Sequence, residues 1–339
     1  MERILYLNDR FCAVAEDGRL TEYIPVRPED QAGRILTGRV DRIMAGLEAA
    51  FVDIGREKDG FLPLKENSGS FTDGPLRSGD RILVQIRREE TGQKGAALSR
   101  DLSIPGSRLI LMPKNRHIGV SARIQDPETR ERMLETGRKL AEGRFGLVLR
   151  EAAAEADEES LRNEAESLLE QWNRILRGEE LPTGPAEELI RDYTPRGISR
   201  VLRETELSPD LQRQLREAEN RKVRLPHGGN IVIDRCEALT VIDVNSASDA
   251  GSANRRETAL RTNLEACREI VIQARLRNLA GILIVDLIDM DAAEDRERVR
   301  QALEEMLRED RIKTVIHGFT SLGLLEMTRK RSRTAWQEK

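Results

Sequence analysis

Two short runs of β-branched and aliphatic residues, each reaching an aspartate, constrain the fold more than any other feature of this chain. Residues 239–245 are LTVIDVN and residues 281–290 are GILIVDLIDM, so the runs lead to Asp243 and Asp286. Apolar runs of this length and composition are typical of buried strands. The sequence therefore predicts two strands, each with a carboxylate at its end.

The segment between the two runs predicts a helix that connects them. Its apolar positions follow a 4-3-4-3 spacing, which puts them on one helical face. These positions are Leu260, Leu264, Cys267, Val271 and Ala274. A strand, a helix and a second strand form a crossover, which favours parallel strands. Both carboxyl ends then lie at one edge of the sheet, where open α/β sheets place their sites.

Two carboxylates at one sheet edge predict a divalent cation between them, because they repel each other without one. Mg²⁺ takes one or two carboxylates and leaves room for phosphate oxygens and water. Asn245 adds an amide that can orient a carboxylate or a bound water. An aspartate at a strand end also commonly caps the next turn. Spacing alone does not choose between Asp286 and Asp289, although in an extended strand these two point to opposite faces.

Length, charge and cysteine usage restrict the class of protein. The 339 residues are enough for two or three domains, and the net charge of −4 means that any nucleic-acid site must be a local patch. Cys12, Cys236 and Cys267 are far apart and form no Cys-x-x-Cys motif, which argues against a zinc ribbon. The first residues do not resemble a signal peptide, and no apolar run is long enough to span a membrane. We therefore expect a cytoplasmic protein without a membrane span.

Residues 34–100 contain five short strand-like runs separated by glycine-containing turns, which predicts a small closed barrel of the OB type. Barrels of this type bind single strands by stacking bases on aromatic rings beside basic residues. The aromatic candidates are Phe51 and Phe61, with Lys94 and Arg39 as basic residues. A phenylalanine in a strand is also a common core residue, so this alternative stays open.

The other segments predict supporting structure. Residues 1–26 form a hairpin that is too small to stand alone and should pair with a later segment. Residues 105–150 predict strands around a helix, residues 155–177 an amphipathic helix, and residues 178–222 a connector. Residues 313–317 predict a strand, and residues 321–333 a final helix with a basic cluster. The cluster is Arg329, Lys330, Arg331 and Arg333, and either solvent exposure or phosphate binding explains it.

Several long motifs resemble the ribonuclease E/ribonuclease G family. In the second half of the chain they are EALTVIDVNS at 237–246, TNLEA at 262–266, ARLRNLAG at 274–281, IVDLIDM at 284–290 and GFTSLGLLEMTRKR at 318–331. The last motif is nearer to ribonuclease G than to ribonuclease E. In the first half, GLEAAFVDIG at 46–55 and DGFLPL at 59–64 resemble the OB-type RNA-binding barrel of the family.

The resemblance implies an endoribonuclease that cuts single-stranded RNA and prefers a 5′-monophosphate end. It implies a catalytic Mg²⁺, with Mn²⁺ as an alternative ion, held by Asp243 and Asp286 and supported by Asn245. The other implied sites are RNA contacts from Phe51, Phe61, Lys94, Arg329, Lys330 and Arg331, and a 5′-end pocket including Gly119, Val120 and Arg150.

The implied fold class is α/β (α+β multidomain), with an OB-type β-barrel inserted in an RNase H-like subdomain and followed by a DNase I-like α/β catalytic subdomain. Residues 1–34 are assigned to an N-terminal hairpin of the RNase H-like subdomain, 35–104 to the barrel and 105–177 to a region like the 5′-end sensor. Residues 178–222 are assigned to the RNase H-like part and connector, and 223–339 to the catalytic domain.

Three departures from the family pattern affect the expectations. The cysteine pair that shares a zinc ion between protomers would follow the final motif, but the sequence ends at Lys339 without it, so no zinc is expected. Arg150 is followed by Glu151 where the family has a threonine, and this charge opposes a phosphate. The connector is shorter than in the family. A homodimer is the assembly that this sequence still allows.

The resulting functional prediction is metal-assisted hydrolysis of single-stranded RNA in RNA processing or decay. His117, His227 and His317 are scattered, so none of them is predicted as a base. A non-catalytic RNA-binding protein on the same scaffold is the first alternative. A ribosome-assembly factor with narrow nuclease activity is a further one.

Overall fold

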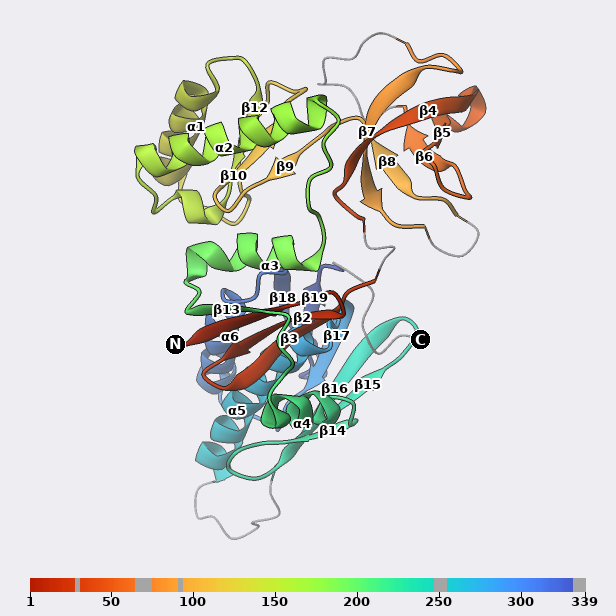
Figure 1. Ribbon diagram of the computed structural model, residues 1–339. Coiled ribbons are helices and arrows are strands. Elements are labelled where there is room, and N and C mark those ends of the chain that lie inside the picture. The colour runs from red at the N-terminus through yellow and green to blue at the C-terminus, as the bar shows by residue number, and fades with distance from the viewer. Residues whose placement is uncertain (28–30, 65–74, 91–93, 247–254, 332–339) are drawn as a thin grey trace. The chain divides into compact units, whose positions relative to one another are not determined.

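The computed structural model describes residues 1–27, 31–64, 75–90, 94–246 and 255–331 (Figure 1). The chain divides into two compact units. The first unit combines Met1–Pro25 with Ile198–Lys339, and the second is the continuous segment Val26–Gly197. The second unit is therefore inserted into the first, and each is described below by itself.

The N-terminal hairpin belongs to a four-stranded sheet in the first unit. Its strands are β1 (Arg3–Leu7), β2 (Phe11–Glu16), β3 (Arg19–Pro25) and β13 (Arg200–Arg203), in the order β13-β1-β2-β3. Strand β13 pairs in parallel with β1. The prediction that the early hairpin pairs with a later segment is thus confirmed. Helix α4 (Pro209–Glu217) packs near β3 and begins after Ser208, whose side chain accepts a hydrogen bond from the Leu211 backbone amide.

A six-stranded sheet forms the larger layer of the first unit. Its strands are β14 (Lys222–Arg224), β15 (Asn230–Arg235), β16 (Leu239–Asn245), β17 (Gly281–Asp286), β18 (Thr314–Phe319) and β19 (Leu325–Arg329). The order is β14-β15-β16-β17-β19-β18, and only β16 and β17 are parallel. Helix α5 (Arg255–Leu276) is the crossover between them, which confirms the predicted crossover and its parallel strands.

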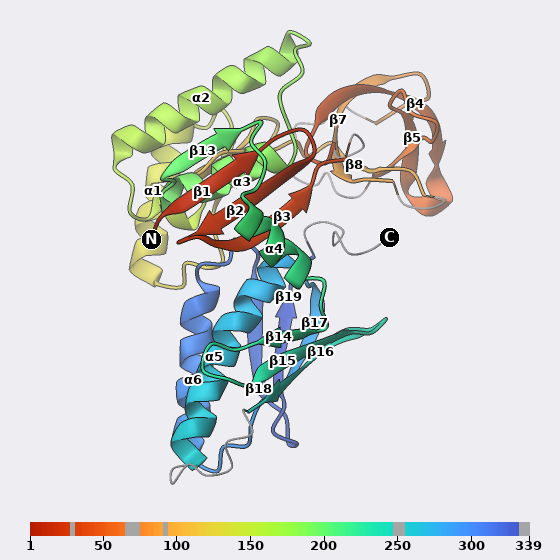
Figure 2. The same cartoon turned by 60° about the horizontal axis from the view of Figure 1, so that its bottom comes forward.

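Helices α5 and α6 (Ala293–Leu307) cover one face of this sheet, as Figure 2 shows. The residues between them form one apolar cluster, in which Ile242 and Val285 from the central strands lie with Cys267 from α5 and Leu303 from α6. Burial raises the pKa of the Cys267 thiol to about 12, so this cysteine is a structural residue.

The opposite side of α5 faces the small sheet with charged side chains in addition to Leu276, which lies in the apolar cluster of that sheet. Arg275 donates to Glu16 at 3.0 Å, and Glu269 forms an ion pair with Arg19. Burial raises the pKa of Glu16, but Arg275 and Arg3 outweigh it, so the net pKa lies below the ordinary value. Helix α5 is therefore held between two sheets by two kinds of interaction.

The second unit contains a closed five-stranded barrel, which confirms the predicted barrel architecture. Its strands are β4 (Ile35–Met44), β5 (Ala49–Asp53), β6 (Gly60–Pro63), β7 (Arg81–Arg88) and β8 (Ala97–Ser99), closing in the order β4-β5-β6-β8-β7. The short helix η1 (Ala45–Leu47) joins β4 to β5. Val52, Leu62, Ile86 and Leu98 fill the interior.

A four-stranded sheet follows the barrel in sequence. Its strands are β9 (Ile104–Pro105), β10 (Leu109–Met112), β11 (Ile118–Val120) and β12 (Gly146–Leu149), in the order β11-β12-β10-β9. Helices α1 (Pro127–Ala141) and α2 (Glu158–Leu176) pack on it through a shared apolar cluster. The short helices η3 (Glu151–Ala153) and η4 (Thr194–Arg196) and helix α3 (Pro185–Tyr193) complete the unit.

The predicted final helix at 321–333 is wrong, because this segment forms strand β19 instead. Leu325, Met327 and Arg329 are buried and alternate with less buried residues, which is the period of a strand and not of a helix. Gly323 has a φ of +85° in the tight turn that precedes the strand. Arg333 lies outside the described residues. The basic cluster is therefore not carried by a helix.

The change from helix to strand also changes the role of Arg329, whose side chain points into the protein. It pairs with Asp310 at 2.7 Å and donates to the Leu279 carbonyl oxygen at 2.8 Å. The side chains of Arg329 and Asp310 are 2% and 0% exposed. The prediction that Arg329 contacts RNA does not fit this position, since its donors are used inside the fold. Lys330 and Arg331 remain exposed.

Removing one member of this buried ion pair should destabilise the first unit. Asp310→Ala leaves the Arg329 charge buried without its partner, so we expect the free energy of unfolding to fall by about 3–5 kcal/mol. Urea unfolding measures this change. Lys330→Ala, an exposed neighbour, is the control and should leave stability near that of the wild type. A loss below about 1 kcal/mol for Asp310→Ala would contradict the structural role of the pair.

Candidate active site and nucleic-acid interface

Asp243 and Asp286 are direct partners in the parallel ladder between β16 and β17. Adjacent strands lie about 4.8 Å apart, and residues in register project from the same face. The two carboxylates therefore stand side by side. Both residues are exposed, while Ile242 and Val285 just before them are buried against the helices. The acids lie on the sheet face opposite α5 and α6, and Asp289 lies beyond the end of β17.

Asn245 is on the same face as Asp243, two residues further along β16. Its Nδ2 donates to Oδ2 of Asp243 at 2.7 Å. This contact fixes one oxygen of the carboxylate and leaves Oδ1 to other partners. The structure thus brings together the three predicted residues Asp243, Asp286 and Asn245.

The donor set of these three residues fits a hard divalent cation. Within the described residues no group of three or more His, Cys, Asp or Glu side chains forms a complete metal site. Two carboxylates with a supporting amide are the limited set that suits Mg²⁺, which keeps several positions for water and phosphate oxygens. Two histidines have partners elsewhere, because His227 Nδ1 lies 2.6 Å from Glu265 Oε1 and His317 Nε2 lies 2.8 Å from Thr328 Oγ1.

Basic residues lie on the same sheet near the acids, at the edge formed by β14. The ladder pairs place Lys222, Val232, Asp243 and Asp286 in one row across four strands. Lys222 is exposed. Arg221 donates to Asp234 at 2.6 Å, and its pKa is raised by this bond and, more weakly, by the charge of Asp243. Lys222 therefore lies in the same row of the sheet as the acids, two strands from Asp243, where a positive charge suits a phosphodiester backbone.

Phe51 and Phe61 face each other across neighbouring barrel strands. They are partners in the β5–β6 ladder, and their ring centroids lie 6.0 Å apart in an edge-to-face arrangement. Neither belongs to the apolar cluster in the barrel interior, and Phe61 is 37% exposed. The Arg42 guanidinium lies over the Phe51 ring at 4.6 Å. The Phe61 ring is therefore available at the surface, as base stacking requires, while Phe51 is partly buried.

Sequence reasoning missed Arg42, because its position opposite Phe51 comes from the register of the β4–β5 ladder. Lys94 is exposed and precedes Gly95, where an added Cβ would lie 2.0 Å from the Asp59 carbonyl oxygen. This close approach holds Lys94 beside the start of β6, the strand that carries Phe61.

The predicted 5′-end residues Gly119, Val120 and Arg150 lie at neighbouring strand ends. Val120 pairs with Leu149 in the parallel β11–β12 ladder, and Arg150 follows Leu149 directly. A Cβ at position 119 would lie 2.8 Å from Nε2 of His117, so a larger residue there would displace the imidazole of this exposed histidine. The structure brings these three predicted residues together.

Two carboxylates restrict what this group can bind. Arg150 Nη2 donates to Asp192 at 2.9 Å, and Nη1 donates to the Gly106 carbonyl oxygen at 2.7 Å. Glu151 accepts a hydrogen bond from Ser121, the residue after Val120. Its side chain is therefore directed toward the predicted pocket, and its negative charge opposes an anionic ligand there.

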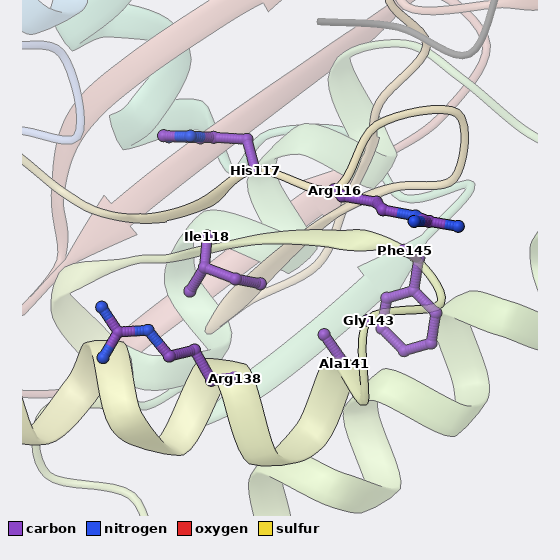
Figure 3. Close-up of a pocket in the computed structure, with 7 residues that line it drawn as sticks. All are labelled: Arg116, His117, Ile118, Arg138, Ala141, Gly143 and Phe145. Carbon is purple, nitrogen blue, oxygen red and sulfur yellow. The ribbon is translucent and has the colours of Figure 1, made fainter.

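A cavity of about 430 Å³ lies between the start of β11 and the end of α1 (Figure 3). Its lining comes from the segment before β11, from α1 and from the turn before β12. The lining residues are Arg116, His117, Ile118, Arg138, Ala141, Gly143 and Phe145. None of the three predicted 5′-end residues is among them. In Figure 3 the Arg116 and Arg138 guanidinium groups lie on either side of an apolar floor.

Comparisons with known proteins identify the family of this chain. The model of the Ribonuclease E/G family matches residues 103–208 and 206–332. Ribonuclease G of Haemophilus influenzae is 35% identical over 386 residues, covering 96% of this chain and 78% of the relative. Ribonuclease G of Escherichia coli K12 is 32% identical over 375 residues, covering 94% and 77%. Ribonuclease E of the same strain is 37% identical over 360 residues, covering 89% and 34%.

The share of the relative's length that this chain covers differs between ribonuclease G and ribonuclease E. This chain spans about three quarters of each Ribonuclease G and about one third of Ribonuclease E, which agrees with the expected nearer resemblance to ribonuclease G. The match to the Haemophilus protein is longer than the 339 residues of this chain, so that relative carries residues that this chain lacks. No helix in the described part of the chain is long and apolar enough to cross a membrane. The chain belongs to the Ribonuclease E/G family.

Proposed function

We propose that this protein is a Mg²⁺-dependent endoribonuclease that hydrolyses single-stranded RNA at Asp243 and Asp286. As a member of the Ribonuclease E/G family, the chain is an endoribonuclease of RNA processing. The observation that carries the finer proposal is the register pair of carboxylates at the ends of β16 and β17. Their exposure and their side-by-side position support a shared cation.

The chemistry follows from what these side chains do. Asp243 and Asp286 would hold Mg²⁺, which when bound polarises the scissile phosphate and lowers the pKa of water. Asn245 keeps the Asp243 carboxylate in one orientation through its hydrogen bond. Lys222 and Arg221 offset the negative charge of the incoming backbone. Hydrolysis by water leaves a 5′-phosphate and a 3′-hydroxyl.

The barrel and the basic segment after β19 would hold the substrate. Phe51 and Phe61 offer ring faces and edges to unpaired bases, with Lys94 beside the start of β6, the strand that carries Phe61. This arrangement selects RNA for being unpaired and does not select a particular base sequence. Lys330 and Arg331 are exposed and add phosphate contacts. We extend the proposal to RNase H-like and DNase I-like subdomains in the first unit, a homodimer and a cytoplasmic location.

A non-catalytic RNA-binding protein is the second candidate, and Glu151 is the observation that favours it. A carboxylate directed toward the predicted 5′-end pocket weakens the binding of a 5′-monophosphate there. The paired acids favour the enzyme. An activity assay on acid variants separates the two candidates.

Replacing either acid by its amide should abolish cleavage. Asp243→Asn and Asp286→Asn keep the shape but bind Mg²⁺ poorly, so we expect at least a ~100-fold loss of rate on a labelled single-stranded oligonucleotide. Asp289→Asn, on an exposed aspartate beyond β17, is the matched control and should cleave normally. Full activity in either acid variant, or cleavage in excess chelator, would refute the metal assignment.

Phe61→Ala should weaken the binding of single-stranded RNA by about 1–3 kcal/mol, because one stacked base is lost. Its melting temperature should change little, since the ring is partly exposed. Leu62→Ala is the matched control, as Leu62 is fully buried in the barrel interior and should lose stability instead. RNA affinity and melting temperature are measured on the same samples. Unchanged affinity in folded Phe61→Ala would count against the stacking role.

The charge of Glu151 should make the preference for 5′-monophosphate RNA weak. Glu151→Thr removes the repulsion, so we expect the ratio of cleavage rates on 5′-monophosphate and 5′-hydroxyl oligonucleotides to rise about tenfold, equivalent to about 1.4 kcal/mol. Glu155→Thr, an exposed glutamate nearby, is the control. A strong wild-type preference that Glu151→Thr leaves unchanged would show that this carboxylate does not affect the end pocket.

A further inference from the structure

Asn263 of helix α5 holds the backbone of the chain just after Asp286. Its Nδ2 donates to the Ile288 carbonyl oxygen at 2.8 Å, and its Oδ1 accepts from the Ile288 amide at 3.0 Å. The side chain is completely buried. One side-chain amide therefore satisfies both polar groups of the residue two positions beyond the acid.

The contact between Asn263 and Ile288 matters because the ladder between β16 and β17 ends at the two acids. Asp243 and Asp286 are the last partners in this ladder, and β17 ends at Asp286, so the chain leaves the sheet directly after Asp286. A residue beyond the end of a ladder has no strand partner for its amide and carbonyl groups. Asn263 supplies both missing bonds and takes the place of a neighbouring strand residue.

The connection from β17 to α6 is held again at its far end. Asp295, in the first turn of α6, accepts a hydrogen bond from Arg256 of α5 at 2.6 Å. Asp295 is 3% exposed. Helix α5 thus contacts both ends of the connection, and only the Asn263 contact lies next to an acid of the candidate site.

The identity of the residue argues for a role beyond packing. Asparagine is a poor helix former, and Ala266 and Cys267, the next buried residues along α5, are apolar. An aliphatic residue would suit this environment but would leave the Ile288 groups buried without partners. The position therefore requires a side chain with one donor and one acceptor.

We propose that Asn263 is a positioning residue for the metal site. It fixes the backbone that follows Asp286 and so aligns that carboxylate with Asp243, without contacting the ion or the RNA. This inference rests on the proposed function, because it assumes that the two acids bind a divalent cation. Mutation of a residue that orients a metal ligand without touching the ion commonly lowers metal affinity 10–100-fold.

The test measures the binding of Mn²⁺ alone by electron paramagnetic resonance, without RNA or cleavage. In Asn263→Ala we expect Mn²⁺ to bind about 10–100-fold more weakly than in the wild type. Asn263→Ser is the milder second variant, and its affinity should lie between those two. Circular dichroism on the same samples gives the folded fraction to which each affinity is referred.

The neighbouring residue Thr262 provides the matched control. It is 6% exposed, and its hydroxyl donates to the Thr258 carbonyl oxygen of the same helix. Thr262→Ala should therefore lower stability but leave Mn²⁺ affinity unchanged. Equal loss of affinity in Thr262→Ala and Asn263→Ala would overturn the proposal, because it would indicate a general effect on α5.

Two further outcomes would also overturn the inference. The first is wild-type Mn²⁺ affinity in folded Asn263→Ala. The second is failure of both Asn263 variants to fold while Thr262→Ala folds, which would make the side chain purely structural. The proposed function is checked separately with Asp286→Asn. If Asp286→Asn binds Mn²⁺ as tightly as the wild type does, the metal assignment is refuted. That outcome concerns the proposed function and not the role of Asn263.

Discussion

The candidate site depends on the register of one parallel strand pair, β16 with β17. Successive residues of a strand point to opposite faces, so a shift by one residue would turn one carboxylate toward the helices and separate it from the other. Helix α5 maintains this register because it is the crossover itself. Its apolar side packs on the large sheet and its charged side on the small one. The relative position of the two carboxylates therefore depends on α5, which packs against the large sheet on one side and the small sheet on the other.

Much of this arrangement could be predicted from residue patterns alone. The aliphatic runs that reach Asp243 and Asp286, with an amphipathic helix between them, are local signals that lead to a crossover with few alternatives. The barrel strands also carry local signals, since their runs are short and their turns contain glycine. What spacing could not decide was Asp286 against Asp289. The ladder places Asp286 opposite Asp243, which is a contact between strands far apart in sequence.

The parts that sequence reasoning missed depend on contacts that leave no local pattern. Residues 325–331 combine aliphatic and basic side chains, a composition that suits a helix as well as a strand. The pairing of this segment with β17 decides for the strand. Arg329 belongs to a basic run, yet it is buried because Asp310 lies opposite it. Arg150 also has partners that are far from it in sequence, namely Gly106 and Asp192. Long-range partners decide whether a charged residue serves the fold or a ligand.

The insertion of one unit into the other has a consequence for synthesis on the ribosome. Strands β1 to β3 emerge first, but their partners β13 and α5 follow only after all of Val26–Gly197. The inserted unit is continuous, so it is free to fold while the rest of the chain is still being translated. A nascent chain at that stage contains every strand of the barrel but neither Asp243 nor Asp286. The order of synthesis therefore separates the inserted unit in time from the strand pair that carries the two carboxylates.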